Sequence, residues 1–459
     1  MTGAGDTIAA IATGGGVSAV GIIRLSGPRA VEIADLVFRA YSNVRMADVR
    51  DRKLCYGELL GADGDVADIC LCTVSRGPGS YTGEDTAEFQ CHGSPAALSE
   101  GLRAVFAAGA RQAAAGEFTK RAFLNGRMDL SQAEAVIDLI EAQTAGAAKN
   151  AAGQLSGAIR TKIESIYGAL LDMTAHFFAA IDYPDEDIGA FETESYAGLL
   201  DGALRELERL SRSFERGRVV KDGAAAAIVG RPNVGKSSFL NALVGYERAI
   251  VAATAGTTRD TIEEKVSVGG VLLRLIDTAG IRASSDEVES QGVARARAAA
   301  SGAQLVIAVF DGSGEATESD RAIAALAATA ERSVAVVNKS DLPQVFDASA
   351  LGGAAGAVCR VSALTGEGLD DFGEAVASLF PEGGPAPWGE MITNERQAEA
   401  IGRAAASIEA ARDALGAGAT HDAALSELEA ALAALGEITG VTVREDLVTR
   451  IFERFCVGK

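Results

Sequence analysis

The chain has 459 residues, 48% of them apolar, which is enough material for about three domains with separate cores. It has no run of about eighteen apolar residues and no basic N-terminal stretch followed by an apolar one, so we expect a cytoplasmic protein without a membrane span. The six cysteines include no Cys-x-x-Cys pair, which gives no support for a zinc site or disulfide framework. The net charge of −21 argues against a protein that binds nucleic acid mainly through its phosphates.

Residues 1–120 mix short apolar runs with helical patterns. Val20–Leu25 and Ile69–Val74 have the length of strands, and helices are expected over Ala30–Ala40 and Ala96–Ala107. This mixture predicts a compact α/β domain.

The pattern becomes helical over residues 121–220. Ser131 to Glu134 has the Ser-x-x-Glu form of a capping box, which predicts the start of a helix. Leu199–Ser213 is a further helical stretch. Between them, apolar residues at spacings of three and four predict one buried helix face, formed by Ile159, Ile163, Ile166 and Leu170.

Helical pattern returns over residues 378–459, after an α/β stretch at 221–377. Because two helical blocks flank this stretch, we expect it to be a domain inserted into a helical domain. The second block has a leucine stripe formed by Leu425, Leu428, Leu432 and Leu435.

The inserted stretch begins with a phosphate-binding loop from Gly230 to Ser237. The loop reads Gly-Arg-Pro-Asn-Val-Gly-Lys-Ser and lies between an apolar run, Ala224–Val229, and a helical stretch, Ser238–Val244. Glycines permit a turn whose backbone N–H groups face a phosphate, and the helix N-terminus favours negative charge. Lys236 is expected to reach the β- and γ-phosphates, and Ser237 to ligate Mg²⁺.

Three further apolar runs alternate with helical stretches: Val271–Ile276, Leu305–Phe310 and Val334–Val337. This alternation predicts a parallel sheet with its ligand at the carboxyl ends of the strands. Asp277 follows the first run and can hold the magnesium shell, while Gly280 can offer a backbone N–H to a γ-phosphate.

The residues after the later runs favour guanine. The Asp341 carboxylate can accept from guanine N1–H and the 2-amino group together, whereas adenine would leave it unpaired. Asn338 is expected to tie its loop to the phosphate loop, and the Ala363 N–H to donate to guanine O6. The predicted GTP-binding residues are Asn233, Val234, Gly235, Lys236, Ser237, Ser238, Thr257, Thr258, Asp277, Thr278, Ala279, Gly280, Asn338, Lys339, Asp341, Ser362 and Ala363.

Ile281 occupies the position at which many GTPases have a water-orienting glutamine. Either hydrolysis is poor or other groups act together with Lys236 and Asp277. Asn233 can ligate a monovalent cation beside the phosphates, and Glu289 can orient the attacking water. The alternatives are that Asn233 only caps the loop and that Glu289 is a solvated surface acid.

Residues 249–260 lie where a switch loop ordered by Mg²⁺ belongs. Thr258 is the expected second hydroxyl ligand of Mg²⁺. The carbonyls of Ala252 and Thr254 and the hydroxyl of Thr257 can complete a cage for the monovalent cation.

Several motifs together resemble the MnmE (TrmE) family of tRNA-modification GTPases. They are the phosphate loop, Ala-Gly-Thr-Thr-Arg-Asp ending at Asp260, Asp-Thr-Ala-Gly-Ile-Arg beginning at Asp277, and the last five residues, Phe-Cys-Val-Gly-Lys, ending at Lys459. The closing Cys-x-Gly-Lys is the most specific of them. The resemblance runs along the full chain.

The resemblance implies a multidomain α/β plus all-α fold. An N-terminal α/β domain (1–120) would bind tetrahydrofolate and dimerise, and a Ras-like P-loop G domain (221–377) would be inserted into a helical bundle (121–220 and 378–459). The implied activity is a potassium-activated GTPase that forms a homodimer and, with the flavoprotein MnmG, a heterotetramer. Together with MnmG it would add an aminomethyl or carboxymethylaminomethyl group to C5 of the wobble uridine of certain tRNAs, with 5-formyl- or methylene-tetrahydrofolate as one-carbon donor.

The resemblance also implies residue roles. It assigns the water-orienting role to Glu289 and the folate pocket to Arg24, Glu88, Arg127 and Lys459. A carboxylate such as Glu88 can pair the adjacent N–H donors of a pterin, and the anionic folate tail suits arginine or lysine. Arg127 replaces a lysine found in a version of the family, which keeps the charge but not the shape. The implied potassium ligands are Asn233, Ala252, Thr254 and Thr257.

Cys456 has two interpretations. Its neighbours Arg454 and Lys459 can stabilise a thiolate that would attack uridine C6. Alternatively it is a small packed residue after Phe455, and this second interpretation is the preferred one.

Two other functions compete with the family assignment. One is a regulatory GTPase that assists ribosome assembly, although relatives of that kind usually carry an RNA-binding domain where this chain has an acidic helical block. The other is a folate aminomethyltransferase whose GTP site only regulates.

Overall fold

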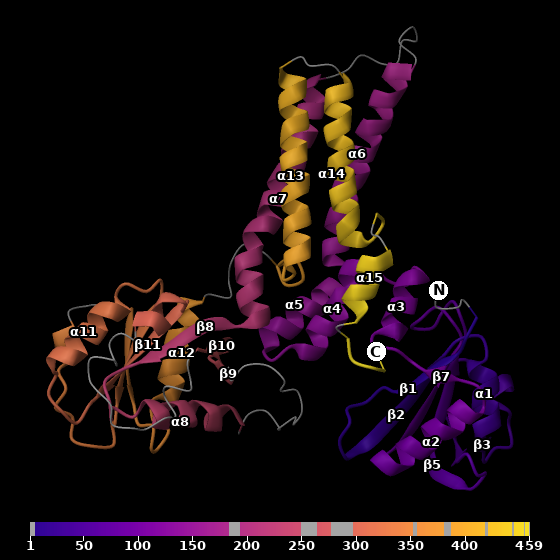
Figure 1. The fold of residues 1–459 in the computed structure, drawn as a ribbon, viewed down its shortest axis with the longest axis horizontal. Helices are drawn as coiled ribbons and strands as arrows, with labels where there is room; N and C mark the ends of the chain where they lie inside the picture. The colour runs from indigo at the N-terminus through magenta and orange to yellow at the C-terminus, as the bar shows by residue number, and fades with distance from the viewer. Residues whose placement is uncertain are drawn as a thin grey trace. The chain divides into compact units, whose positions relative to one another are not determined.

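The computed structural model describes residues 5–182, 193–248, 264–276, 297–351, 356–380, 387–417, 421–442, 445–453 and 455–458. The chain forms two compact units (Figure 1). Unit 1 comprises Met1–Ile137, Ile159–Asp172 and Leu432–Lys459, and unit 2 comprises Asp138–Ala158 and Met173–Ala431. Among the helices of the described residues, none is long and apolar enough to cross a membrane.

Unit 1 contains a seven-stranded sheet in the order β3-β4-β5-β6-β2-β1-β7. All its pairs are antiparallel except β1 with β7. The strands predicted over Val20–Leu25 and Ile69–Val74 are confirmed by β2 and β5. The seven strands are β1 (Ile8–Ile11), β2 (Ser18–Ser26), β3 (Phe38–Ala40), β4 (Cys55–Leu60), β5 (Val66–Ser75), β6 (Thr86–Gly93) and β7 (Arg111–Gln112).

Two helices, α1 (Ala30–Val37) and α2 (Pro95–Ala107), pack on one face of this sheet around a shared core (Figure 1). The helix expected over Ala30–Ala40 is too long. It ends at Val37 because residues 38–40 pair with β4 as strand β3, where Phe38 packs against Phe89. A 3₁₀ turn, η1 (Met46–Asp48), follows β3.

The helix predicted from Ser131 is α4 (Leu130–Glu141), but its capping box lies two residues earlier than expected. The Asp129 N–H donates to Gln132 Oε1 at 3.0 Å, and the Gln132 N–H donates to Asp129 Oδ1 at 2.7 Å. The Ser131 hydroxyl also donates to Asp129 Oδ1, at 2.8 Å. Asp129 therefore takes the capping position that the sequence pattern assigned to Ser131.

The remaining helices outside the inserted domain range from 8 to 30 residues in length. Both predicted apolar stripes, that of α6 and that of α14, are buried, with no member more than 8% exposed. These helices are α3 (Glu117–Leu124), α5 (Ala145–Leu155), α6 (Ala158–Asp182), α7 (Thr193–Asp222), α13 (Glu395–Gly416), α14 (His421–Thr439) and α15 (Glu445–Phe452).

A cluster of arginines and carboxylates joins α3 to the first strands of unit 1. Arg121 Nη2 lies 2.6 Å from Asp6 Oδ1, and Arg121 Nη1 lies 3.0 Å from Glu84 Oε2. Arg111 Nη2 lies 2.6 Å from Glu117 Oε1. Burial alone would raise the pKa of Glu117, but hydrogen bonds from Arg111, the backbone and Arg121 hold that pKa below its ordinary value.

Unit 2 contains the predicted sheet, in the order β13-β12-β11-β8-β10-β9. Neighbouring strands are parallel except β9 with β10, and this antiparallel edge was not predicted. Helices α8 and α12 share one core with the sheet, and α11 packs in a second core on its other face. The elements are β8 (Ala224–Val229), α8 (Lys236–Arg248), β9 (Glu264–Val268), β10 (Val271–Leu275), β11 (Leu305–Asp311), α11 (Glu318–Ala327), β12 (Ser333–Asn338), η2 (Ala348–Leu351), β13 (Ala357–Val361) and α12 (Leu369–Leu379).

The α/β domain is inserted into the helical domain, as expected. The chain enters it from α7 and returns into α13, which packs along α7. The Ile392 N–H donates to Ser213 Oγ at 3.0 Å, and Lys221 Nζ lies 2.8 Å from Asp138 Oδ1. Thr393 also donates to Asp138, at 3.0 Å, so the segments entering and leaving the domain are held by shared partners.

Candidate functional site

The carboxyl ends of four parallel strands in unit 2 lie at one edge of the sheet. Val229 of β8 pairs with Ala308 of β11, and Asn338 of β12 lies between Asp311 and Val361. The phosphate loop and the polar residues after β11, β12 and β13 therefore meet at this edge. The parallel sheet is as predicted, and the binding of a ligand at this edge stays a prediction.

The phosphate loop has a backbone that requires special residues. Gly235 has a φ of 94°, and a Cβ on it would lie 2.3 Å from Asn338 Nδ2. Asn233 has a φ of 65° in the left-handed region, which asparagine tolerates better than most residues, and its side chain is exposed. The loop leads into the N-terminus of α8, so backbone N–H groups and the helix dipole face the same space.

Lys236 reaches back over this loop. Its Nζ donates to the carbonyls of Gly230 and Arg231, both at 2.8 Å. Burial lowers the pKa of Lys236, and an adjacent phosphate anion would oppose that shift. Ser237 and Ser238 are exposed at the start of α8. The cation, the close-packed glycine and the helix N-terminus fit a nucleotide phosphate, and the Ser237 hydroxyl fits a magnesium ligand.

Asn338 joins the two halves of the site. Its side chain is buried, Nδ2 donates to the Val234 carbonyl at 3.0 Å, and Oδ1 accepts from the Ala363 N–H at 3.0 Å. The expected tie between this loop and the phosphate loop is therefore present. To donate to guanine O6, the Ala363 N–H would have to be shared with Asn338 Oδ1 or give up that hydrogen bond.

The remaining residues of the base loop are held by neighbours. Asp341 is exposed and its Oδ1 accepts from the Ser362 hydroxyl at 2.6 Å, which leaves its other oxygen for a base. Lys339 has a φ of 65°, and its Nζ lies 2.7 Å from Asp311 Oδ2. Burial alone would raise the pKa of Asp311, but hydrogen bonds from Lys339 and Ser313 hold it below its ordinary value.

Asp311 is a residue to which the sequence analysis gave no role. Its carboxylate positions Lys339, which was predicted to bind the nucleotide. The signal was available, because an acid that ends a strand next to a strand ending in Asn-Lys-x-Asp must lie beside that lysine in a parallel sheet.

Several predicted residues lie outside the described part of the chain. They are Ala252, Thr254, Thr257, Thr258, Asp277, Thr278, Ala279, Gly280, Glu289 and Lys459.

The predicted folate residues Arg24 and Glu88 lie opposite each other on β2 and β6 of unit 1. Arg24 Nε donates to Glu88 Oε1 at 2.7 Å, and its guanidinium lies 5.7 Å from the ring centre of Tyr81 and 5.8 Å from that of Phe118. A pterin would have to share Glu88 with Arg24. Arg127 is exposed. The three predicted residues supply two cations and one acid, and Tyr81 and Phe118 add an aromatic surface beside Arg24.

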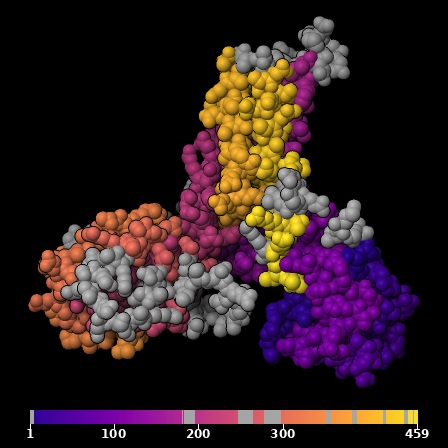
Figure 2. Space-filling view, viewed as in Figure 1, coloured from indigo at the N-terminus to yellow at the C-terminus, as the bar shows by residue number. Residues whose placement is uncertain are grey.

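The C-terminal segment packs into unit 1 (Figure 2). Val457 forms an antiparallel bridge with Ala115, and Gly458 has a φ of 99° with its Cα against the Ile11 carbonyl. A Cβ on Gly458 would lie 2.3 Å from that oxygen. The segment therefore ends beside β1, the neighbour of the strand that carries Arg24.

Cys456 is exposed, so its interpretation as a packed residue is wrong. The backbone explains the difference. The Cys456 carbonyl accepts from the Gly116 N–H at 3.3 Å, and Phe455 is the residue whose side chain enters the core. The thiol of Cys456 faces outward as a result.

The sequence matches two family models, described as GTP-binding protein TrmE N-terminus over residues 7–127 and MnmE helical domain over residues 130–456. The tRNA modification GTPase MnmE of Chloroflexus aurantiacus is 46% identical, covering 99% of this chain and 100% of its own. That of Symbiobacterium thermophilum is 45% identical, covering 99% of each. Among solved structures, Era of Aquifex aeolicus is 24% identical over 40% of this chain and 66% of its own, with a TM-score of 0.26. The chain therefore belongs to the MnmE family of tRNA modification GTPases.

Proposed function

We propose that this protein is a cytoplasmic, potassium-activated GTPase that acts with the flavoprotein MnmG. Together they would add an aminomethyl or carboxymethylaminomethyl group to C5 of the wobble uridine of certain tRNAs, with a tetrahydrofolate derivative as one-carbon donor. The observation that carries the nucleotide part is the Asn338 side chain, which links the phosphate loop to the loop that holds Asp341. This link supports the proposal because it would hold the residues for phosphate binding and for guanine recognition in one site.

Different residues of the chain would bind the phosphates, the base and the metal ions. Lys236 leaves the loop carbonyls for the phosphate oxygens, and Asp341 pairs the guanine edge. Ser237 and Thr258 would hold Mg²⁺, with Asp277 in its shell, and the ion would supply positive charge against the phosphates. Glu289 would orient the attacking water, and potassium would be held by Asn233, Ala252, Thr254 and Thr257.

The potassium role rests on Asn233, whose side chain is exposed beside the phosphate loop. Asn233→Gly permits the left-handed backbone and removes the whole side chain with its oxygen, while Asn233→Asp keeps an oxygen at the same place. We expect the wild type and Asn233→Asp to turn over GTP faster in potassium than in sodium, and Asn233→Gly to lose most of that difference. Equal wild-type rates in the two salts would remove the cation from the mechanism.

The folate site is proposed at Arg24, Glu88, Arg127 and Lys459. Its support is the Arg24–Glu88 pair beside the Tyr81 ring, together with the C-terminal segment that ends near the same sheet. Titration with 5-formyltetrahydrofolate should show binding to the wild type and about tenfold weaker binding to Glu88→Gln, because a charge-assisted hydrogen bond is lost. Unchanged affinity would remove Glu88 from the site.

The proposed assembly is a homodimer that forms a heterotetramer with MnmG and meets tRNA jointly with it. The net charge of −21 supports this sharing, because an acidic protein needs a basic partner or a local patch to bind phosphates. The test is nucleoside analysis of tRNA from cells that lack this gene. Intact wobble modification in those cells would refute the proposed function.

A further inference from the structure

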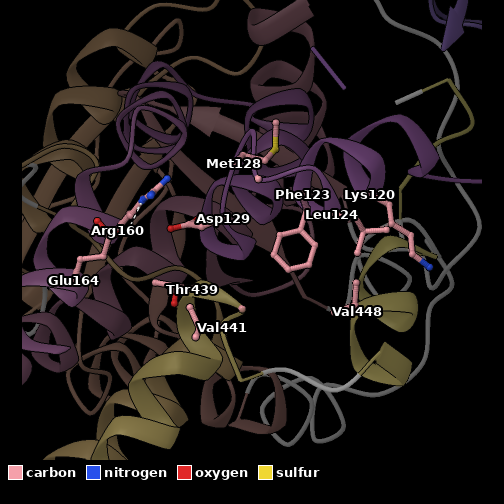
Figure 3. Close-up of a pocket in the computed structure, with 12 residues that line it drawn as sticks. Lys120, Phe123, Leu124, Met128, Asp129, Arg160, Glu164, Thr439, Val441 and Val448 are labelled. Carbon is pink, nitrogen blue, oxygen red and sulfur yellow. Dashed lines mark hydrogen bonds and ion pairs between the residues drawn. The ribbon is translucent and has the colours of Figure 1, made fainter. Parts of the chain in front are cut away.

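Most arginines of unit 1 are paired with carboxylates. Figure 3 shows one such pair at the wall of a cavity of about 590 Å³, where Arg160 Nε lies 2.7 Å from Glu164 Oε1. Guanidiniums paired in this way are already neutralised and are not free for a ligand anion. The arginines of unit 1 in ion pairs are Arg24, Arg29, Arg39, Arg45, Arg76, Arg103, Arg111, Arg121 and Arg160.

The exposed cations of unit 1 that lack an ion pair gather in one loop. Arg50, Arg52 and Lys53 are exposed, and none of them forms an ion pair with another described residue. Arg127 and Arg450 are in the same state, but each is alone in its part of the chain. We call residues 45–53 the basic loop.

The acids of the basic loop act on other cations. Asp35 accepts from Arg45 Nε at 2.8 Å, and the charge of Asp48 also acts on Arg45. Asp51 pairs with Arg76 at 2.5 Å. The positive charge of the three exposed cations is therefore left for a ligand, in a chain that has 42 Lys and Arg against 63 Asp and Glu.

Arg76 holds the basic loop in one conformation. Its Nη1 donates to the Val49 carbonyl at 3.0 Å and to Asp51 Oδ1 at 2.5 Å, and its Nη2 donates to the Ala47 carbonyl at 2.5 Å. Hydrogen bonds from Arg76 lower the pKa of Asp51, and the charge of Arg52 adds a smaller effect in the same direction. The loop is thus organised before any ligand binds.

Arg52 has an unusual backbone conformation. Its φ is 61°, in the left-handed region that large side chains rarely adopt. Its N–H donates to the Val74 carbonyl at 2.8 Å, and its Nη2 donates to the Gly79 carbonyl. Strained residues persist where their surroundings fix them, and such positions gather at binding sites. The conformation of Arg52 therefore favours a functional role for the loop.

The basic loop contacts the segment that carries part of the proposed folate site. Gly79 is two residues from Tyr81, and the Tyr81 ring centre lies 5.7 Å from the Arg24 guanidinium. Gly83 of the same segment packs beside Arg127, because a Cβ on it would lie 3.3 Å from Arg127 Cγ. Two residues of chain span at most about 7 Å, so the basic loop lies close to the surface proposed for the one-carbon donor.

We propose that the basic loop binds phosphates of the tRNA, with Arg50 and Lys53 as the main contacts. The inference rests on the proposed function, because a uridine can receive carbon from folate only if its tRNA lies beside the folate site. Exposed cations without a partner are the groups that RNA phosphates require. The loop would be the local patch through which an acidic protein meets RNA.

The test is fluorescence anisotropy of the full-length protein with labelled tRNA that has uridine at the wobble position, at several salt concentrations. Arg50→Gln/Lys53→Gln removes two positive charges and leaves the hydrogen bonds of Arg52 and Arg76 in place. Each lost phosphate contact makes the fall of log affinity with log salt shallower by about 1, so we expect a difference of about 2. Between about 50 and 200 mM salt the wild type should then lose about tenfold more affinity than the variant.

Two further variants separate charge from structure. Arg50→Lys/Lys53→Arg keeps both charges and should keep the wild-type salt dependence. Lys265→Gln/Arg321→Gln removes exposed cations of unit 2 that also lack an ion pair among the described residues, and it should bind tRNA like the wild type. Equal salt dependence of the wild type and Arg50→Gln/Lys53→Gln, an equal loss in the unit 2 control, or no tRNA binding by the wild type at low salt would overturn the proposal.

Other anionic partners give different results with the same variant. We expect Arg50→Gln/Lys53→Gln to bind 5-formyltetrahydrofolate like the wild type, and neither protein to sediment with vesicles of phosphatidylcholine and phosphatidylserine. Weaker folate binding with unchanged tRNA binding would assign the cations to the folate tail. Vesicle binding that the variant loses, with unchanged tRNA binding, would assign them to a membrane. Either result would overturn the proposal.

The loop and the proposed function fail in different measurements. Unchanged tRNA binding by Arg50→Gln/Lys53→Gln refutes the loop and leaves the function standing. Intact wobble modification in cells that lack this gene refutes the function, whatever the loop binds.

Discussion

Replacing Asn338 tests whether one buried amide holds the nucleotide site together. Its side chain donates to the Val234 carbonyl and accepts from the Ala363 N–H, both at 3.0 Å. Asn338→Ala removes both bonds and leaves a carbonyl and an N–H unpaired at the junction of the two loops. The loops that carry phosphate binding and base recognition would then lose their direct link.

The expected loss of nucleotide affinity follows from the Val234 carbonyl and the Ala363 N–H that Asn338→Ala leaves unpaired. Each unpaired buried group costs about 1–3 kcal/mol, and water entering the space of the lost side chain recovers part of the sum. A net loss of about 2 kcal/mol corresponds to a roughly 30-fold weaker nucleotide affinity. Asn338→Asp keeps the acceptor for Ala363 but sets a carboxylate oxygen against the Val234 carbonyl, so we expect no better binding than with alanine.

The assay is fluorescence titration of the full-length protein with labelled GDP. Ser340→Ala is the matched control, because Ser340 lies in the same loop and its buried hydroxyl has no partner among the described residues. We expect the control to bind GDP within about twofold of the wild type, since no hydrogen bond is lost. Wild-type affinity in Asn338→Ala, or an equal loss in Ser340→Ala, would refute the reasoning.

Four further predictions address the other parts of the molecule. Arg121→Met leaves partly buried acids without their shared cation and should lower the free energy of unfolding by about 3–5 kcal/mol. Urea denaturation and amide exchange in β1 would measure this loss. Unchanged amide exchange in the variant would contradict the prediction. The pKa of Glu117 is held below its ordinary value of 4.5, so the stability that its ion pairs contribute is complete above that pH and is lost as the pH falls. Glu117→Gln should therefore make the free energy of unfolding depend less steeply on pH in the acid range. Gly458→Ala adds a Cβ that would meet a carbonyl of β1 and should weaken folate binding, whereas Val457→Ala, at an exposed side chain, should not. Equal folate affinities of the two variants would exclude a role for the terminal segment. Asp277→Asn should abolish wobble-uridine modification, measured by mass spectrometry of tRNA nucleosides, and unchanged modification would mean that GTP hydrolysis only regulates.

The sheet of the inserted domain was predictable because its strands are buried on both faces. Such strands are continuous apolar runs, and Ala224–Val229 coincides with β8. Its antiparallel edge strand β9 was missed, since Glu264–Val268 has only five residues and no continuous apolar run; in the structure it pairs with β10. The meeting of the loops that follow these strands was also predictable, because parallel topology brings the carboxyl ends of the strands to one edge of the sheet.

The failures share a different cause, which is competition from tertiary contacts. The pattern at Ser131 is a valid capping box, yet Asp129 accepts from the Gln132 N–H and the helix begins at Leu130, which leaves Ser131 inside it. Residues 38–40 continue a helical pattern but gain more by pairing with β4. Cys456 is small and apolar enough to be packed, but Phe455 fills the core beside it. In each case local preference is correct and a neighbour distant in sequence decides the outcome.

The C-terminal segment shows how far such long-range decisions can reach. Val457 and Gly458 have no periodic pattern of their own, and their position is set by Ala115 and by the carbonyl of Ile11. Both partners belong to the N-terminal part of the chain, so the last residues complete a surface whose strands were formed by the first hundred. A chain shortened by its last few residues would keep every strand and helix of unit 1 and still lose that surface. Packing thus explains the glycine of the closing Cys-x-Gly-Lys, because a Cβ at Gly458 would meet the Ile11 carbonyl where the backbone passes β1, whereas Cys456 is exposed.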